Sequence, residues 1–197
     1  DAIGFMPRVL CGRTKADLQT TLMGQKYDLP FGIAPVGMSG LMWPNAEPLL
    51  AAAASKAGIP YGLSTVATKA PEDIGPHLNN NGWFQMYPPR DPEIRLDMLR
   101  RAKESGFDTL VITVDVPVAS RRERQVRSGL TQPPKLTLRL MAQTVMRPTW
   151  AMQMAFRPLP HMKTLDPYTK NDVALDSTAH VGYLLRTSPD WSYIQKL

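Results

Sequence analysis

The stretch Thr109-Leu-Val-Ile-Thr-Val-Asp115 decides the fold class of this chain, because it has the pattern of a buried strand that ends on a carboxylate. Its middle is apolar and rich in β-branched residues, which favour strands. Val116-Pro-Val-Ala-Ser-Arg121-Arg122-Glu123 follows, so a proline and an arginine cluster come directly after it. Asp115 is either a solvated residue that stops a strand or a site residue at the carboxyl edge of a parallel sheet.

Earlier segments repeat this strand pattern, and helix signals separate them. We expect strands at residues 30–38, 59–63, 83–87 and 109–115, helices at 45–57, from 71 and at 91–106, and a hairpin at 22–29. Asn45 and Asp91 are the expected helix N-caps. This order predicts a parallel α/β sheet, either an open doubly wound sheet or the first half of a (β/α)8 barrel. No G-x-G-x-x-G follows the first strand, which disfavours a dinucleotide-binding open sheet.

Polar side chains and a Pro-Val-Gly turn stand at the carboxyl ends of the expected strands. In chain order they are Pro35, Val36 and Gly37, then Ser64 and Thr65, then Gln85 and Tyr87, then Thr113 and Asp115. Buried amides and hydroxyls without partners would cost about 1–3 kcal/mol each. They either bond neighbouring backbone groups or hold a planar heterocycle with amide-like edges.

Five short motifs resemble one family, in its order and spacing. They are Phe5-Met-Pro-Arg-Val-Leu, Ile33-Ala-Pro-Val-Gly-Met, Leu63-Ser-Thr-Val-Ala-Thr, Trp83-Phe-Gln-Met-Tyr and Ile112-Thr-Val-Asp-Val-Pro, with Arg121-Arg-Glu close behind. Together they resemble the FMN-dependent α-hydroxy acid dehydrogenases and oxidases. The resemblance implies a TIM (β/α)8 barrel. Residues 1–131 would be its N-terminal half, 132–187 a long excursion after the fourth strand, and 188–197 the start of the next barrel helix, with Ser188 as its N-cap.

The resemblance also implies a role for each matching residue. Pro35, Val36 and Gly37 would lie against FMN, and Ser64, Gln85 and Thr113 would hydrogen-bond its ring. Tyr87 and Asp115 would be catalytic, with Tyr87, Arg122 and Gly37 at the substrate. The implied reaction oxidises an L-2-hydroxy acid, lactate-like or mandelate-like, to the 2-oxo acid. The alternative is a catalytically incompetent fragment or scaffold subunit of such a flavoprotein.

Gly37 bears on the size of the substrate. Relatives of this kind often carry alanine at this position, and glycine leaves more room beside the cofactor. We therefore expect a larger, aromatic substrate side chain.

The family's catalytic histidine and phosphate site follow the fifth strand, which this sequence does not reach. Asp115 would stabilise the cation on that histidine. We therefore expect a complementary C-terminal half-barrel chain, and the resemblance suggests a tetramer of barrels.

Composition and charge limit the other kinds of partner that this chain could bind. The net charge is +6 and the chain has one cysteine, so an intrachain disulfide is impossible. The basic residues are spread out without aromatic interleaving, which argues against a nucleic-acid partner. Residues 136–146 and 149–156 are expected amphipathic helices, and 163–180 a polar loop. The segment 132–160 is apolar and basic, so it is either a lid or a peripheral contact with the inner face of a membrane, in an otherwise cytoplasmic protein.

Overall fold

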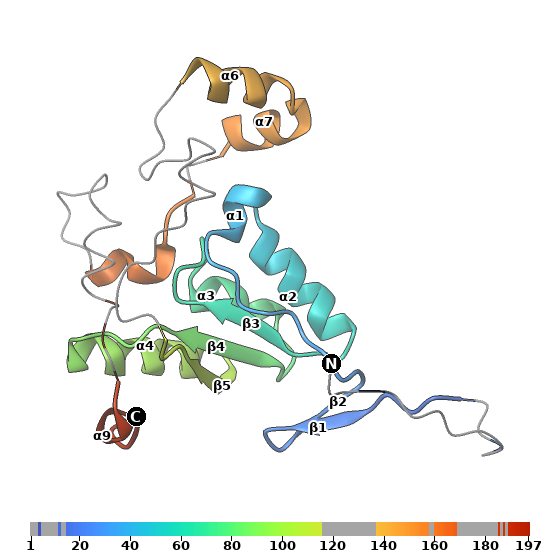
Figure 1. Ribbon diagram of the computed structural model, residues 1–197, viewed down its shortest axis with the longest axis vertical. Coiled ribbons are helices and arrows are strands. Elements are labelled where there is room, and N and C mark those ends of the chain that lie inside the picture. The colour runs from blue at the N-terminus through green and yellow to red at the C-terminus, as the bar shows by residue number, and fades with distance from the viewer. Residues whose placement is uncertain are drawn as a thin grey trace.

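A computed structural model describes residues 4, 12, 15–115, 137–157, 160–168, 185, 187 and 189–197. Its centre is a parallel sheet of three strands in the order β3 (Tyr61–Ser64), β4 (Gly82–Met86) and β5 (Phe107–Ile112), shown in Figure 1. The predicted parallel βα order is therefore confirmed.

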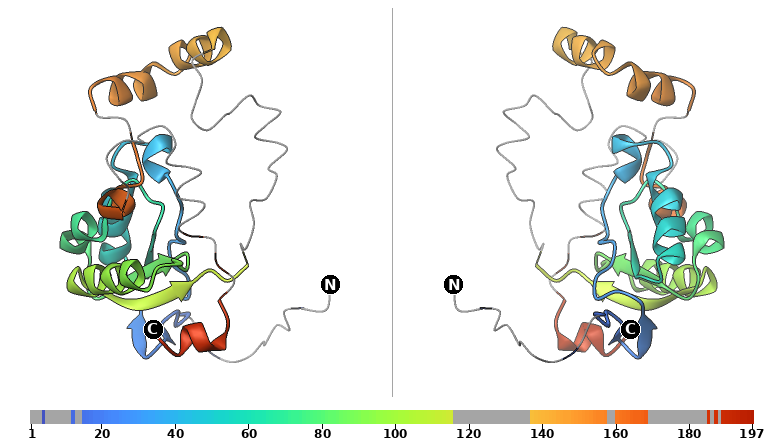
Figure 2. Two further views of the ribbon diagram at one scale, coloured as in Figure 1. Left: turned by 90° about the vertical axis from the view of Figure 1, so that its left-hand side faces the viewer. Right: turned by 90° about the vertical axis from the view of Figure 1, so that its right-hand side faces the viewer.

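Helices cover one face of this sheet, as both views in Figure 2 show. They are α2 (Ala46–Lys56), α3 (Pro71–Ile74) with the 3-10 turn η1 (Gly75–His77), and α4 (Pro92–Glu104), while the short α1 (Ser39–Met42) contacts α2. The core lies between the two layers, where Leu63, Phe84 and Phe107 of the strands pack against Ala54 and Ile74 of the helices. One-sided cover in the described residues gives the sheet an outer, helix-packed face and an inner face.

The first expected strand, residues 30–38, is reduced to a single parallel bridge between Ile33 and Tyr61. The Ile33 N–H donates to Pro60 O at 2.8 Å, and Ile33 O accepts from the Gly62 N–H at 2.8 Å. Pro35 and Pro60 have no N–H to donate, so the ladder between this segment and β3 cannot extend in either direction. The segment still lies beside β3, where a first barrel strand belongs.

Helix ends follow the expected glycines but not both expected caps. Gly58 and Gly106 adopt φ values of +61° and +86° and end α2 and α4. The Asp91 side chain accepts from the Glu93 N–H at 2.8 Å, as a helix cap does. Asn45 is different: it precedes α2 in a left-handed conformation, and its side chain makes no capping bond.

The expected hairpin is present as β1 (Thr20–Leu22) and β2 (Gln25–Tyr27), and its two-residue turn is Met23-Gly24. The Trp83 indole N–H donates to the Tyr27 hydroxyl at 3.0 Å, and the two rings pack edge to face at 6.4 Å. Since Trp83 is the second residue of β4, the hairpin is attached at the amino end of the sheet.

The excursion contains the two expected amphipathic helices, α6 (Leu138–Val145) and α7 (Pro148–Ala155). Figures 1 and 2 show them apart from the sheet and close to α1. The Trp150 indole N–H donates to Leu41 O at 2.9 Å and fixes this approach. None of the described helices has the length and apolar character needed to cross a bilayer.

Two expectations for the rest of the excursion were wrong. Within the expected polar loop, residues Lys163–Tyr168 form a 3-10 helix, η2, and bury Thr164 and Leu165. The last helix, α9 (Trp191–Ile194), is capped by Asp190, whose side chain accepts from the Tyr193 N–H at 2.8 Å. Ser188, the expected cap, lies outside the described residues.

Candidate functional site

Three of the predicted cofactor residues form one hydrogen-bonded chain across the sheet. Ser64 Oγ donates to Gln85 Oε1 at 2.8 Å, and Gln85 Nε2 donates to Thr113 Oγ1 at 2.7 Å. Ser64 is paired with Gln85 in the parallel register, and Gln85 is paired with Val111, two residues before Thr113. Residues i and i+2 share a face, so all three side chains lie on the inner face of the sheet.

This chain satisfies part of its polarity internally. Ser64 and Gln85 are buried, and Thr113 is partly buried. The internal bonds use one N–H of the Gln85 amide and leave Thr113 with its hydroxyl proton to donate. A wall that still offers an amide N–H and a hydroxyl fits the amide-like edge of an isoalloxazine ring, so the residues present fit FMN.

Thr65 connects the strand ends at the candidate site, although the family resemblance assigned it no role. It is fully buried, its hydroxyl donates to Gln85 O at 2.6 Å, and it accepts from the Tyr87 N–H at 3.3 Å. One threonine therefore ties the end of β3 to the end of β4 just before Tyr87. The adjacent Ser64-Thr65 pair was the available signal, because one hydroxyl faces each side of the strand end.

The Pro35-Val36-Gly37 segment is exposed and lies along the end of β3. The Met38 N–H donates to Val66 O at 2.9 Å. A Cβ placed on Gly37 would lie 2.7 Å from Val66 Cγ2. The space that glycine leaves is thus bordered by a valine methyl group, which the sequence argument about substrate size did not consider.

The predicted catalytic residues lie in different surroundings. Tyr87 follows β4, is partly buried, and packs against the cluster of Met98, Leu165 and Leu185. Asp115 is exposed and lies three residues beyond the end of β5. It is therefore not the last residue of the strand, as the sequence suggested, but part of the segment that follows. Arg122 lies outside the described residues, and its role stays a prediction.

Glu47, in the first turn of α2, is a buried carboxylate. Its Oε1 accepts from the Thr68 hydroxyl at 2.6 Å, the Thr68 N–H at 2.9 Å and the Gly40 N–H at 3.3 Å. Burial raises the pKa of Glu47, but the hydrogen bonds from Thr68 lower it by more, so its pKa lies below the usual value. Glu47 thereby joins the loops that follow the first two strand positions.

Other polar features lie away from this wall. A surface hollow on the outer, helical side is lined by Glu72, Gly75, Pro76, Arg101, Glu104, Ser105 and Gly106. Among the described residues, no three metal-ligating side chains gather into a cluster. The candidate site is therefore the inner face at the strand ends.

Comparison with known proteins decides the family. The family model described as FMN-dependent dehydrogenase matches residues 1–197. This chain belongs to the FMN-dependent dehydrogenase family. Its fold is accordingly part of a TIM barrel, as the sequence predicted, and FMN is the cofactor of this family.

Three proteins show what this chain is similar to. The L-lactate dehydrogenase of Ectopseudomonas mendocina (strain ymp) is 36% identical over 183 residues, which cover 92% of this chain and 48% of the relative. The structure of the monotopic membrane protein (S)-mandelate dehydrogenase matches with a TM-score of 0.88 at 28% identity, covering 98% of this chain and 51% of that protein. A mandelate oxidase with (S)-mandelic acid matches 64% of the chain and 37% of its own at 36% identity, with a TM-score of 0.60. The chain thus spans about half the length of the first two of these relatives.

Proposed function

We propose that this chain is the amino-terminal half of the barrel of an FMN-dependent L-2-hydroxy acid dehydrogenase. The substrate is a lactate-like or mandelate-like acid, and the product is the 2-oxo acid. The observation that carries the proposal is the Ser64–Gln85–Thr113 chain on the inner face, in a member of this family.

The chain's own residues bind and orient the cofactor. Ser64, Gln85 and Thr113 hold the edge of the ring, and the Pro35–Gly37 backbone lies against it. When bound, FMN would supply the two-electron acceptor for oxidation of the substrate's α-carbon. Thr65 keeps β3 and β4 in register at this point through its bonds to Gln85 and Tyr87.

Substrate binding falls to Tyr87 and Arg122. A guanidinium grips a carboxylate in a two-bond geometry that lysine cannot match. The Tyr87 hydroxyl donates a hydrogen bond to the substrate's carboxylate or hydroxyl oxygen. Asp115 stabilises the positive charge of a histidine from the second half of the barrel, which raises the pKa of that base and holds its orientation.

The experiment uses the complete gene product that contains this sequence. Its visible absorption, its mass and its turnover of L-lactate and (S)-mandelate are measured together. A flavin band with oxidation of either acid supports the enzyme. A colourless protein that oxidises neither contradicts it and favours the alternative, a catalytically incompetent scaffold.

The other half of the barrel is proposed to pair with the free edge of β5. Among the described residues β5 pairs only with β4, and Leu110 on it is exposed. An unpaired apolar strand edge invites further strands. We place them on a complementary C-terminal half-barrel, and we propose a tetramer of such barrels. Mass spectrometry and light scattering of the native protein test both points, and a folded monomer of 197 residues would contradict them.

Helices α6 and α7 are proposed to rest on an anionic membrane surface. The side chains of Leu138 and Phe156 are 86% and 87% exposed, and the exposed Arg147 and Arg157 flank this apolar surface. In such a surface the apolar side chains enter the acyl region of the bilayer, and the flanking cations attract anionic lipid headgroups. The relative described as a monotopic membrane protein supports this location.

Flotation with vesicles of mixed neutral and anionic phospholipid tests the contact. We expect the intact protein to float, and the double variant Leu138→Ser, Phe156→Ser to remain at the bottom. Leu49→Ser is the matched control, because Leu49 is an exposed leucine on α2. Equal flotation of all three would show that α6 and α7 form a lid instead.

A further inference from the structure

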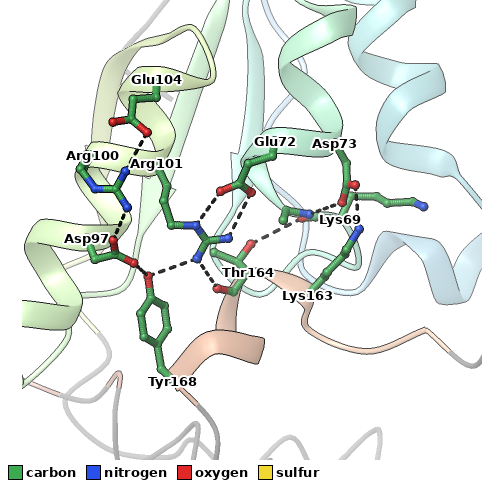
Figure 3. A network of polar contacts seen from close by, with 11 residues as sticks. Lys69, Glu72, Asp73, Asp97, Arg100, Arg101, Glu104, Lys163, Thr164 and Tyr168 are labelled. Atoms are coloured by element: carbon green, nitrogen blue, oxygen red, sulfur yellow. Dashed lines mark hydrogen bonds and ion pairs between the residues drawn. The ribbon is translucent and has the colours of Figure 1, made fainter.

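The returning end of the excursion is held firmly against the barrel helices. Arg101 on α4 forms a two-bond ion pair with Glu72, through Nε to Oε1 at 2.6 Å and a second nitrogen to Oε2 at 3.1 Å. The same guanidinium donates to Thr164 O at 3.0 Å and to the Tyr168 hydroxyl at 3.1 Å. Figure 3 shows this network connecting α3, α4 and η2.

Two more contacts close the network. The Tyr168 hydroxyl donates to Asp97, and Lys163 Nζ pairs with Asp73 at 2.7 Å. Burial raises the pKa of Tyr168 to about 12, and the bond to Asp97 acts in the same direction, so this hydroxyl stays a donor at neutral pH.

The network has a consequence for the site because of what η2 carries. Leu165 of η2 is buried with Met98 and Leu185, and Tyr87 and Val66 pack against this cluster. Tyr87 is the proposed substrate-binding residue. Val66 is the side chain that borders Gly37. The cluster therefore supports two positions on the substrate side of the proposed FMN site.

We propose that Arg101 is a positioning residue for substrate binding, and this rests on the proposed function. It holds η2 in place, and η2 sets the orientation of Tyr87 and Val66 through Leu165. Residues 163–168 then support the substrate-binding side of the site from outside. The excursion contributes to the site through these residues, although its helices α6 and α7 lie apart from the sheet.

Adjacent arginines on α4 provide a matched comparison. The Arg101 side chain is 13% exposed and bonds η2, whereas Arg100 is 58% exposed and pairs only with Asp97 and Glu104 among the described residues. Arg101→Met and Arg100→Met remove the same charge from the same helix. Only the first of them releases η2.

The test uses the complete FMN-loaded enzyme and three measurements. They are bound FMN, the kcat and KM for the better of L-lactate and (S)-mandelate, and the hydrogen exchange of the peptides covering 162–168 and 84–90. For Arg101→Met we expect KM to rise about tenfold, with kcat changing less, and faster exchange in both peptides. For Arg100→Met we expect values within about twofold of the parent enzyme.

Two results would overturn the proposal. One is a KM for Arg101→Met equal to that of Arg100→Met. The other is faster exchange at 162–168 with 84–90 unchanged, which would make the network a staple without influence on Tyr87. If Arg101→Met fails to retain FMN, Tyr168→Phe decides, because it keeps the ring and removes the bonds to Asp97 and Arg101. A parental KM and exchange pattern in Tyr168→Phe would then refute the proposal.

The two hypotheses fail separately. A parent protein without FMN or turnover refutes the proposed function. In that same protein, the exchange of 84–90 in Arg101→Met against Arg100→Met still decides whether η2 holds the Tyr87 segment.

Discussion

Gln85 shows how one residue serves both the sheet and the site. Its carbonyl oxygen accepts from Thr65, and its side chain joins Ser64 to Thr113. The side chain of Gln85 can therefore bond neighbouring protein groups and also hold a cofactor. Its amide has more hydrogen-bonding capacity than its protein partners use.

Thr113→Val tests this wall. The substitution keeps the shape but removes the acceptor for Gln85 Nε2 and one hydroxyl donor. We expect FMN affinity to fall about tenfold, equivalent to roughly 1.4 kcal/mol, by fluorescence titration of the complete enzyme. Thr109→Val is the control, since Thr109 lies on the same face of β5 outside the hydrogen-bonded chain. Equal losses in both variants would contradict the assignment.

Gly37→Ala tests the role of Val66 in substrate size. The new methyl group would approach Val66 Cγ2 at 2.7 Å, so one of the two must move. We expect kcat/KM for (S)-mandelate to fall about tenfold, with a smaller loss for L-lactate. Adding Val66→Ala should recover part of the loss. An additive double variant would show that the two positions do not interact.

At the scale of elements, periodic segments were predicted correctly and contact-dependent segments were not. Helices α2, α4, α6 and α7 follow from apolar period and end signals. Residues 163–168 are polar enough to predict a loop, yet they fold as η2 because Arg101 and Asp97 supply partners from α4. Such partners, distant in sequence, override local propensity.

The hairpin offers a prediction at this scale. Tyr27→Phe keeps the edge-to-face ring contact with Trp83 but leaves the indole N–H without its acceptor. We expect the free energy of unfolding in urea to fall by about 1 kcal/mol. Tyr193→Phe is the comparison, and it should cost less because the bond from the Tyr193 hydroxyl to Pro89 O is long, at 3.4 Å. The reverse order would contradict a structural role for the hairpin bond.

At the scale of the whole molecule, several acidic groups on different elements make the stability of the fold depend on pH. Burial raises the pKa of Glu47, Glu72 and Asp73, but the hydrogen bonds that these carboxylates accept outweigh burial, so each pKa lies below its usual value. The main donors are Thr68 for Glu47, Arg101 for Glu72, and Lys163 and the Ala70 N–H for Asp73. A carboxylate whose pKa is lower in the folded state stabilises the fold above its unfolded pKa. That contribution is lost as pH falls through the folded pKa.

We therefore expect the unfolding free energy to decline steeply below about pH 5. Glu47→Gln should flatten this decline, because its site is buried and no longer titrates. Glu104→Gln, at an exposed pair with Arg100, should leave the slope unchanged. Urea unfolding at several pH values measures both slopes, and a parental slope in Glu47→Gln would contradict the role assigned to its lowered pKa.

The sequence by itself determined the parallel βα order, the family resemblance and the set of polar residues that stand at the strand ends. The reason is that apolar period, proline and glycine positions and the residues at strand ends are all local properties of the chain. Only the tertiary structure decided that Glu47 is buried, that Val66 borders Gly37, and that Tyr87 packs against the cluster containing Leu165 of η2. These facts depend on contacts between residues that are far apart in the chain, which no local pattern encodes.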